Sequence, residues 1–574
     1  MNLTRRAAAL ALSALLLLPA ALAAGAPTAP PLSPAQKQED LNVLYDTLKE
    51  AHPNLFANTS EAEFLAKKSE IEAGLDTADD LTFALELQSL AALAGDSHTT
   101  VALGQTDDMH FYPFALTWFA GSWVLTTAPG DSAADLGRTV TAMNGRSMDE
   151  ILAAFSTLVS ADNGVKLRRQ ARQMFYAAEI LDYLGLSSPD GVLTLTMDSG
   201  DTLALFPLSS EQMETFAFSY LADQRDGVPD TAYRKKTYYF SLPLDEQTYY
   251  IQYNVCQEDP DLPMADFAAQ VAADLEAGSY AQVLLDLRNN GGGSDGVIRP
   301  LLDLLAPGVR DSSLRLYGLI GETTFSSAII NAVMIQEMGG ALAGSPTSGS
   351  VDHFGSVGSF TLPHSGRRVG CSTKWIDLGT LLEAGQRYGV EPLQPDVAVE
   401  PTLADYLAGR DTEVEYLLAH GLEFTPPDRG GDPLTRGYLL SLLYNAAQAA
   451  GKDVSAPENE FYDVIPFAYY APAADWAAQA GIAAGNGEGA LEPVRPVTRA
   501  EAAVMLSRFA AYLGLSPAAQ TDAFSDEDLI PVWAREAARQ AGALGLLDAK
   551  SGAFRPNDAM TRSDGAALAE ALLP

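Results

Sequence analysis

The chain has 574 residues, too many for one hydrophobic core, so we expect roughly two to four domains. Hydrophobic residues make up 47% of it, which excludes an intrinsically disordered protein. Its formal net charge of −38 argues against nucleic acid and anionic lipid as partners, because both are anionic. The six histidines are scattered without metal-ligand spacing, so no metal or cofactor is expected. Two cysteines, Cys256 and Cys371, form no disulfide framework, and whether they pair stays open.

Residues 1–24 have the pattern of a secretory signal. Arg5 and Arg6 precede an apolar run, and Ala21-Leu22-Ala23 is a small-x-small cleavage pattern. The run is too short for a membrane anchor, and a Pro/Ala-rich stretch follows it. We therefore expect an exported protein with no membrane span once the signal is removed.

Residues 34–105 are predicted to form a helical N-terminal cap. Apolar side chains recur at helical spacing from Leu41 to Leu48, and Ser60 with Glu63 makes a capping box for the next helix. A third helix ends before a Gly-Asp-Ser-His-Thr segment, which is predicted to be a loop.

Two regions with strand patterns follow this cap. Residues 106–215 alternate short strands with turns, including a strand, an Asn144-Gly145 turn and a helix. Residues 216–422 are predicted to form an α/β core, where a strand, a helix and a second strand indicate a parallel βαβ unit with a buried sheet.

The C-terminal region, residues 430–574, contains internal repeats. Thr435-Arg436, Thr498-Arg499 and Thr561-Arg562 lie 63 residues apart, and other residues match at the same offset. The first repeat is only partial, because its front half is missing.

Ser326 stands where a predicted strand turns into a predicted helix, in "TTFSSAII". Such a place exposes a side chain beside unpaired N–H groups and the positive end of the helix dipole. The alternative is that Ser326 is an ordinary N-cap. The glycines at 291–293 follow another buried strand and allow backbone N–H groups to approach a ligand closely.

Residues 35–415 resemble the C-terminal processing (tail-specific) serine proteases. The resemblance rests on "LLDLRNNGGG", "TTFSSA", "GSPTSG" and "QPDVAVEPT", and "HPNLF" with "GDSHT" points to the tricorn-like branch. It implies a multidomain α/β fold in which residues 216–422 are the catalytic core, with ClpP/crotonase-like βαβ units. Residues 106–215 would then be a PDZ-like domain, with a plain α/β insert as the alternative.

The resemblance also implies roles for the residues around the nucleophile. Ser326 would attack the peptide carbonyl, and the N–H groups of Ser327 and of Gly291 or Gly292 would form the oxyanion hole. The tail-specific branch uses a lysine base, but Ser350 occupies that position, which excludes a serine–lysine dyad.

The tricorn-like branch instead uses a Ser-His pair, which corresponds to Ser97 and His98. A neutral imidazole is a suitable base at neutral pH, so His98 is the candidate, with His353 as its rival. A downstream acid would orient the histidine. The candidates are Glu383 and Glu391, and Glu391 is the predicted catalytic acid.

The C-terminal repeats resemble S-layer homology (SLH) repeats, which are all-α. The resemblance implies that they bind an anionic secondary polymer of a Gram-positive-type cell wall, with Arg436, Arg499 and Arg562 contacting its acidic groups. The alternative is that these arginines only bridge the repeats.

Two functions are therefore predicted. The first is a secreted, wall-anchored serine endopeptidase that cleaves peptide or protein substrates through an acyl-enzyme on Ser326. The second is a wall-anchored binding or scaffold protein whose protease-like core has lost its activity.

Overall fold

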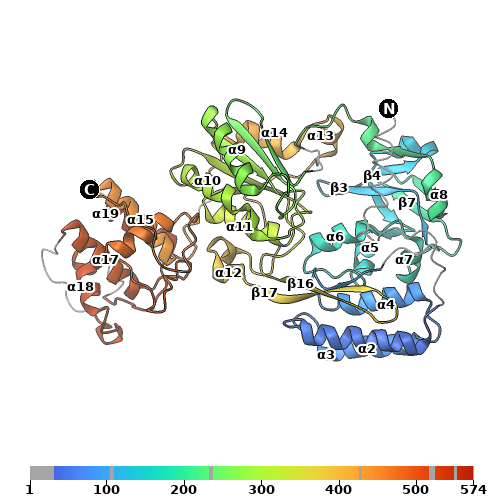
Figure 1. Ribbon diagram of the computed structural model, residues 1–574, viewed down its shortest axis with the longest axis horizontal. Helices are drawn as coiled ribbons and strands as arrows, with labels where there is room; N and C mark the ends of the chain where they lie inside the picture. The colour runs from blue at the N-terminus through green and yellow to red at the C-terminus, as the bar shows by residue number, and fades with distance from the viewer. Residues whose placement is uncertain are drawn as a thin grey trace.

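The structure is a computed structural model, in which the predicted signal segment, residues 1–24, lies outside the described part. Its parts follow one another along the long axis, with the repeats at one end, a mixed α/β core in the middle and the insert and cap at the other end (Figure 1). Within the described part, no helix is both long and apolar enough to cross a membrane. The described residues are 31–103, 109–231, 237–425, 429–515, 524–547 and 552–572.

The core is built on a six-stranded sheet whose strand order follows the chain. Its first strand, β11 (Tyr239–Pro243), is antiparallel to the second, and all other neighbours are parallel. This arrangement confirms the predicted parallel βαβ unit. Whether it is specifically ClpP/crotonase-like stays a prediction. The other strands are β12 (Thr248–Tyr253), β13 (Gln282–Asp286), β14 (Arg315–Ile320), β15 (Ala341–Gly344) and β18 (Val397–Ala398).

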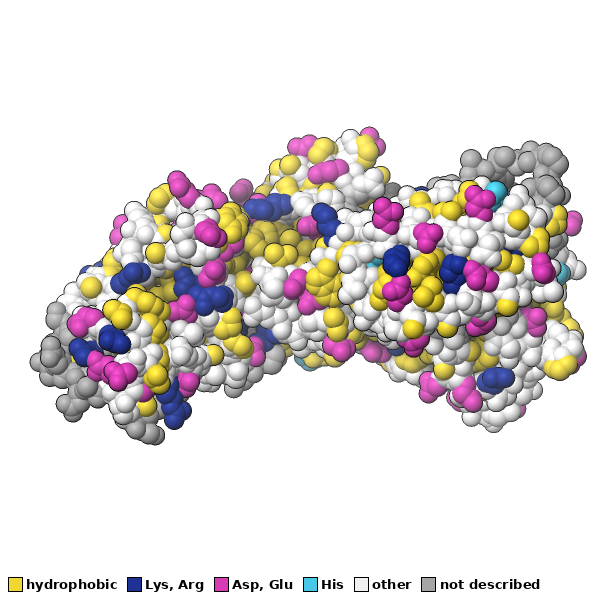
Figure 2. Space-filling model, turned by 90° about the horizontal axis from the view of Figure 1, so that it is seen from below, with side chains coloured by type: hydrophobic (Ala, Val, Ile, Leu, Met, Phe, Trp, Pro, Cys, Tyr) yellow, Lys and Arg dark blue, Asp and Glu magenta, His cyan; other side chains and the backbone are white. Residues whose placement is uncertain are grey.

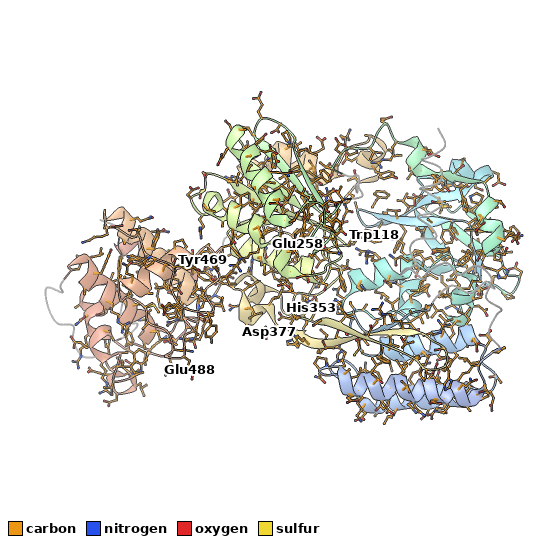
Figure 3. All side chains as sticks on the ribbon, in the orientation of Figure 1. Trp118, Glu258, His353, Asp377, Tyr469 and Glu488 are labelled. Atoms are coloured by element: carbon orange, nitrogen blue, oxygen red, sulfur yellow. The ribbon has the colours of Figure 1, made fainter. Side chains whose placement is uncertain are left out.

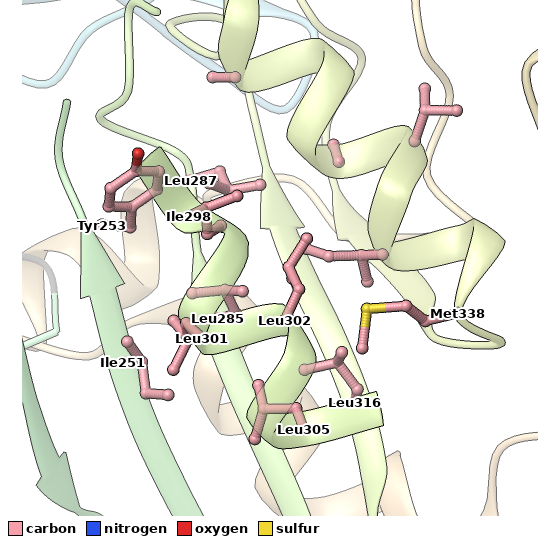
Figure 4. Close-up of a cluster of buried hydrophobic side chains, with 14 of the residues drawn as sticks. Ile251, Tyr253, Leu285, Leu287, Ile298, Leu301, Leu302, Leu305, Leu316 and Met338 are labelled. Carbon is pink, nitrogen blue, oxygen red and sulfur yellow. The ribbon is translucent and has the colours of Figure 1, made fainter. Parts of the chain in front are cut away.

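Helices cover both faces of this sheet. Leu285 and Leu316 of the sheet pack with Leu301, Leu302 and Leu305 of a helix in the main apolar cluster (Figure 4). Every residue of β12 and β13 is buried, as expected for a parallel sheet covered on both sides. One face carries α9 (Met264–Ala277), α10 (Arg299–Arg310) and α11 (Ser327–Glu337), and the other carries α14 (Thr412–His420).

The N-terminal cap is helical, as predicted. Ser60 forms the predicted capping box with Glu63. A long hairpin of the core reaches this cap, where β1 (Thr100–Val101) pairs with its second strand. The cap helices are α2 (Pro34–Ala51), α3 (Glu61–Gly74) and α4 (Asp80–Ala92), and the hairpin strands are β16 (His353–Thr361) and β17 (Arg368–Ile376).

The insert contains small antiparallel sheets and short helices. Asn144 and Gly145 both have positive φ (48° and 74°) and form the predicted turn between β5 and β6. The insert extends beyond the predicted boundary at residue 215, because β10 pairs with β4. Its likeness to a PDZ domain stays a prediction. Its elements are β2 (His110–Phe111), β3 (Ala115–Phe119), β4 (Ser122–Pro129), β5 (Val140–Met143), β6 (Arg146–Ser147), α5 (Met148–Phe155), α6 (Gly164–Arg172), α7 (Ala178–Tyr183), β7 (Leu193–Met197), β8 (Thr202–Leu205), β9 (Leu208–Ser209), α8 (Ser210–Thr215) and β10 (Phe218–Tyr220).

The described residues of the repeat region form helices joined by loops, and the region closes on itself. Isolated bridges join Thr435 to Pro496, Thr498 to Ala559 and Thr561 to Pro433, so the three Thr-Arg segments contact one another in a cycle. Because Pro433, Pro496 and Ala559 are also 63 residues apart, the three contacts are equivalent, as expected for packed repeats. The helices are α15 (Arg436–Ala449), α16 (Ala471–Gln479), α17 (Arg499–Leu513), α18 (Arg535–Ala543) and α19 (Arg562–Leu572), while α12 (Leu378–Leu381) and α13 (Leu403–Leu407) belong to the core.

The repeats dock on the core around one buried carboxylate, that of Glu383. The hydroxyl of Thr435 donates to it over 2.7 Å, and it also binds Tyr469 and Arg562. Tyr469 lies between the two parts in Figure 3, and its backbone N–H donates to the carbonyl of Glu337 over 3.1 Å. A cavity of about 930 Å³ lies beside this junction.

Glu337 makes this junction sensitive to pH. Burial raises its pKa to about 7 from its ordinary value of 4.5. Between these values the folded state holds the proton and the unfolded state releases it. The free energy of unfolding therefore falls as pH rises, by about 3 kcal/mol in all.

Glu337→Gln is expected to lose this pH-dependent part of the stability, so the fall in Tm between pH 5 and pH 8 becomes smaller than in the wild type. The exposed Glu276→Gln is the control, and an unchanged fall in Glu337→Gln would contradict the assignment.

Cys256 and Cys371 are buried free thiols, so they do not form a disulfide.

Asp and Glu side chains are spread among Lys and Arg over the face seen in Figure 2. The negative charge on this face is therefore distributed rather than gathered into one binding patch.

Candidate active site

Ser326 lies in the turn between β14 and α11, with φ +54° and ψ −128°, a conformation disfavoured for any residue with a Cβ. The Phe325 N–H donates to the carbonyl of Asn290 over 3.1 Å, and the Thr324 hydroxyl donates to that of Leu287 over 2.9 Å. The Ser326 side chain makes no capping hydrogen bond. The geometry therefore does not support the alternative of an ordinary N-cap, and it resembles the strained strand-to-helix turn that exposes a nucleophilic serine.

The glycine turn packs directly against this serine. Gly292 has φ +103°, and a Cβ on it would lie 2.8 Å from Cβ of Ser326 and 2.9 Å from the carbonyl oxygen of Phe325. The Ser327 hydroxyl donates to the carbonyl of Gly293 over 2.8 Å and ties the helix start to the same turn. Only glycine allows the two loops to approach this closely.

The predicted oxyanion donors differ in their availability. The N–H of Gly292 already donates to Oδ1 of Asn290 over 2.9 Å. The N–H groups of Gly291 and Ser327 donate no hydrogen bond within the described residues. The structure therefore favours Gly291 over Gly292 as the partner of Ser327.

Asp96 organises the loop that carries His98. Its buried carboxylate accepts from the backbone N–H of His98 over 3.0 Å and from the Thr99 hydroxyl over 2.5 Å, and it lies 3.3 Å from Nε2 of His52. Burial alone would raise the pKa of Asp96, but hydrogen bonds from His52, His98 and Thr99 outweigh burial and hold the pKa well below its usual range. Asp96 is thus a charged acid beside the candidate base.

The imidazole of His98 lies against the residue that precedes Ser326. Its ring stacks on Phe325, with centroids 4.5 Å apart, and on His353, at 5.6 Å. Nδ1 is 3.8 Å from Oδ1 of Asp96. Neither ring nitrogen makes a hydrogen bond within the described residues, so His98 is not bonded to the Ser326 hydroxyl in this state. Catalytic hydrogen bonds often tighten only when substrate binds, so this arrangement is compatible with a role as base.

The rival base, His353, is held differently. Its Nδ1 lies 3.0 Å from the carbonyl of Val351, which fixes the proton on that nitrogen. Burial lowers its pKa. Figure 3 shows His353 where the core meets the insert and cap.

Ser97 faces the insert rather than the nucleophile. Its hydroxyl binds the carboxylate of Asp162, which also accepts the backbone N–H of Ser350 over 3.2 Å. Asn163 donates to the Ser350 hydroxyl over 3.3 Å. The insert therefore occupies the surroundings of the vacated lysine position.

The two predicted acids do not converge on His98. Glu391 is exposed, and the contact that it makes near the site is through its backbone carbonyl, which accepts from Val351 over 3.0 Å. Glu383 binds the repeats. The acid that lies beside His98 is Asp96, which the sequence reasoning missed as an orienting group, although it stands within the motif that carries His98.

The repeat arginines lie in unlike surroundings. Arg436 is buried and donates to the carbonyls of Leu491 (2.8 Å) and Ala484 (3.2 Å). Arg499 is also buried and donates to that of Phe554 over 2.7 Å. These bonds support the alternative that the two arginines bridge repeats, whereas Arg562 bridges to the core.

Comparison with known proteins gives one family match. Residues 460–503 match the S-layer homology domain. The chain thus carries an SLH domain in its C-terminal part. No curated protein matches the chain.

Solved structures similar to this chain include proteases. Mature CPAF in complex with lactacystin is 13% identical, with 67% of this chain and 98% of that chain covered and a TM-score of 0.45. The photosystem II D1 C-terminal processing protease is 14% identical, with 66% of this chain and 95% of that chain covered and a TM-score of 0.32. The tricorn protease is 14% identical, over 67% of this chain and 37% of that chain, with a TM-score of 0.31.

Proposed function

We propose that this protein is a secreted serine endopeptidase anchored to the cell wall by its SLH repeats. The observation that carries the proposal is the strained turn at Ser326, whose side chain caps no helix and whose neighbour Ser327 has an N–H that donates to none of the described residues. His98 lies against the same turn, beside the ionised Asp96.

The reaction would follow the acyl-enzyme route. Oγ of Ser326 attacks the peptide carbonyl carbon while its proton passes to Nε2 of His98, since Nδ1 faces Asp96. The N–H groups of Ser327 and Gly291 stabilise the oxyanion. His98 then gives the proton to the departing amine, which leaves an ester on Ser326. Water that loses its proton to His98 hydrolyses this ester and restores the serine.

The domains around the core would bring enzyme and substrate together. A PDZ-like groove in the insert would bind an extended chain end by strand addition. The SLH repeats would bind an anionic secondary wall polymer, which places the enzyme at the surface of a Gram-positive-type bacterium. Because Arg436 and Arg499 are buried, the polymer would contact other groups of the repeats.

The second candidate is an inactive scaffold with the same anchoring. Two observations favour it: His98 makes no hydrogen bond to Ser326, and Glu383 is occupied by the repeats. It predicts a folded, wall-binding protein with an unreactive serine.

Labelling with a fluorophosphonate separates the two candidates. We expect the chain without its signal segment to be labelled at Ser326, mapped by mass spectrometry, and Ser326→Ala to remain unlabelled. The neighbouring Ser327→Ala controls for the serine that stands beside the nucleophile. A folded wild-type chain that binds cell walls and takes no label would establish the scaffold instead.

A further inference from the structure

The segment His52-Pro53-Asn54 ends helix α2 in the interior of the protein. Pro53 disfavours a helical conformation at the residue before it, and His52 is extended, with φ −75° and ψ 133°. The backbone N–H of His52 still donates to the carbonyl of Leu48 over 3.0 Å and closes the helix. The side chain of His52 is buried, so its polar atoms need partners inside the protein.

The two nitrogens of the His52 ring have different partners. Nδ1 accepts the backbone N–H of Asn54 over 3.1 Å, so the ring proton is on Nε2. Nε2 lies 3.3 Å from Oδ2 of Asp96 and donates to it. Because Nδ1 carries no proton, the ring is neutral, and it binds the carboxylate of Asp96 without cancelling its charge.

Asp96 is thereby held between two histidines, one beside each of its oxygens. Oδ2 accepts from Nε2 of His52 and from the hydroxyl of Thr99. Oδ1 accepts the backbone N–H of His98 and lies 3.8 Å from Nδ1 of the His98 ring. Burial alone would raise the pKa of Asp96, and the hydrogen bond from His52 is the strongest of those that lower it. His52 thus contributes to the charge of Asp96 and to the direction of the oxygen that faces His98.

Further contacts fix the position of the His52 ring. The ring packs against Phe354 of β16, with centroids 4.6 Å apart. Nδ2 of Asn58, in the segment that follows His52, donates over 2.9 Å to the carbonyl of Ala94, which lies just before the loop of His98. The cap and the hairpin therefore hold this imidazole from two directions, as is needed for a group that orients another.

We propose that His52 is a positioning residue of the serine–histidine site, which holds Asp96 so that one carboxylate oxygen faces Nδ1 of His98. A carboxylate oxygen there attracts the ring proton of His98 to Nδ1 and leaves Nε2 able to take the proton of Ser326. It also stabilises the imidazolium that forms when this proton moves. An apolar ring at His52 would fill the same space but would leave Oδ2 of Asp96 with one donor fewer. This inference rests on the proposed function.

The tautomer of His98 tests the proposal without any activity. In protein labelled with ¹⁵N-histidine, the ring nitrogens of the six histidines give NMR signals whose shifts report the tautomer, and those of His98 are the ones lost in His98→Gln. At mildly alkaline pH we expect the wild-type ring to carry its proton on Nδ1. His52→Phe keeps an aromatic ring but has no N–H, so it should give a mixture of both tautomers. His52→Gln, whose amide N–H can replace that of Nε2, should keep the wild-type state.

Steady-state kinetics on a peptide pool give the second readout. We expect His52→Phe to lower kcat about ten- to a hundredfold, the size of loss typical for outer partners that orient functional histidines. KM should stay within about twofold, because His52 acts on the charge that develops in the reaction rather than on binding. His52→Gln should recover most of kcat.

His364→Phe is the matched control. It removes another contact of an imidazole with a carboxylate, that of Nε2 of His364 with Glu39 of α2 over 2.8 Å, at the opposite end of the hairpin from His353. This variant should leave the tautomer of His98 and kcat unchanged. If His52→Phe does not fold, as judged by circular dichroism and a thermal melt, His52→Asn takes its place, because its shorter amide does not reach Asp96.

Three results would overturn the proposal: a mixture of tautomers already in the wild type, a single tautomer that persists in the folded variant without the N–H, or a loss of kcat that His52→Gln does not recover. If the wild type takes no fluorophosphonate label while the tautomer of His98 still depends on His52, the enzyme function fails and the positioning role stands.

Discussion

His98→Ala is expected to lower kcat/KM for peptide hydrolysis about a thousandfold or more, the size of effect seen when a catalytic histidine is removed. The reason is geometric. His98 lies against the turn of Ser326, Asp96 lies beside its Nδ1, and its Nε2 is bonded to none of the described residues. Initial rates on a peptide pool, with fluorophosphonate labelling as a second readout, measure the loss.

His353→Ala is the matched comparison, because it removes the rival imidazole from the same stack. Its ring stacks on His98 rather than on Phe325, so we expect it to act by orienting His98 and its removal to cost about tenfold or less. A thousandfold loss in His353→Ala with little change in His98→Ala would reverse the assignment of the base.

Gly292→Ala is expected to lower the labelling rate and kcat/KM about a hundredfold or more. A Cβ there would lie 2.8 Å from Cβ of Ser326, and φ of +103° is itself disfavoured for alanine. The turn must therefore shift, and the displacement of an oxyanion donor by a shift of this kind has an effect of that size. Circular dichroism and a thermal melt establish that the variant is folded.

Gly291→Ala provides the control in the adjacent residue. A Cβ on Gly291 would meet no atom within 4 Å, and alanine keeps the backbone N–H that we assign to the oxyanion hole. We expect activity within about threefold of wild type, since exposed substitutions of this kind change little. Equal losses in both variants would show that close packing at Gly292 is not the cause.

Local patterns in the sequence predicted much of the fold. Helical spacing and capping boxes predicted the cap, buried strands around a helix predicted the parallel sheet, and residues 63 apart predicted the repeats. The serine turn could be predicted because a strand, a tight turn and a helix are all properties of neighbouring residues. The sequence also pointed to His98, through a motif, before its position was known.

The tertiary structure alone decided how these pieces meet. Asp96 rather than Glu391 lies beside His98, and Glu383 binds the repeats. The N–H of Gly292 donates to Asn290, and α6 places Lys166 over the ring of Phe325. Each of these depends on contacts or on backbone directions that no local pattern encodes: Glu383 and Arg562, for example, are 179 residues apart. The sequence by itself therefore determined the local elements and the candidate residues that they carry, because residue type and local backbone preference are local. Their partners and charges were decided only when the domains packed together, because hydrogen bonding and desolvation depend on what surrounds a group in space.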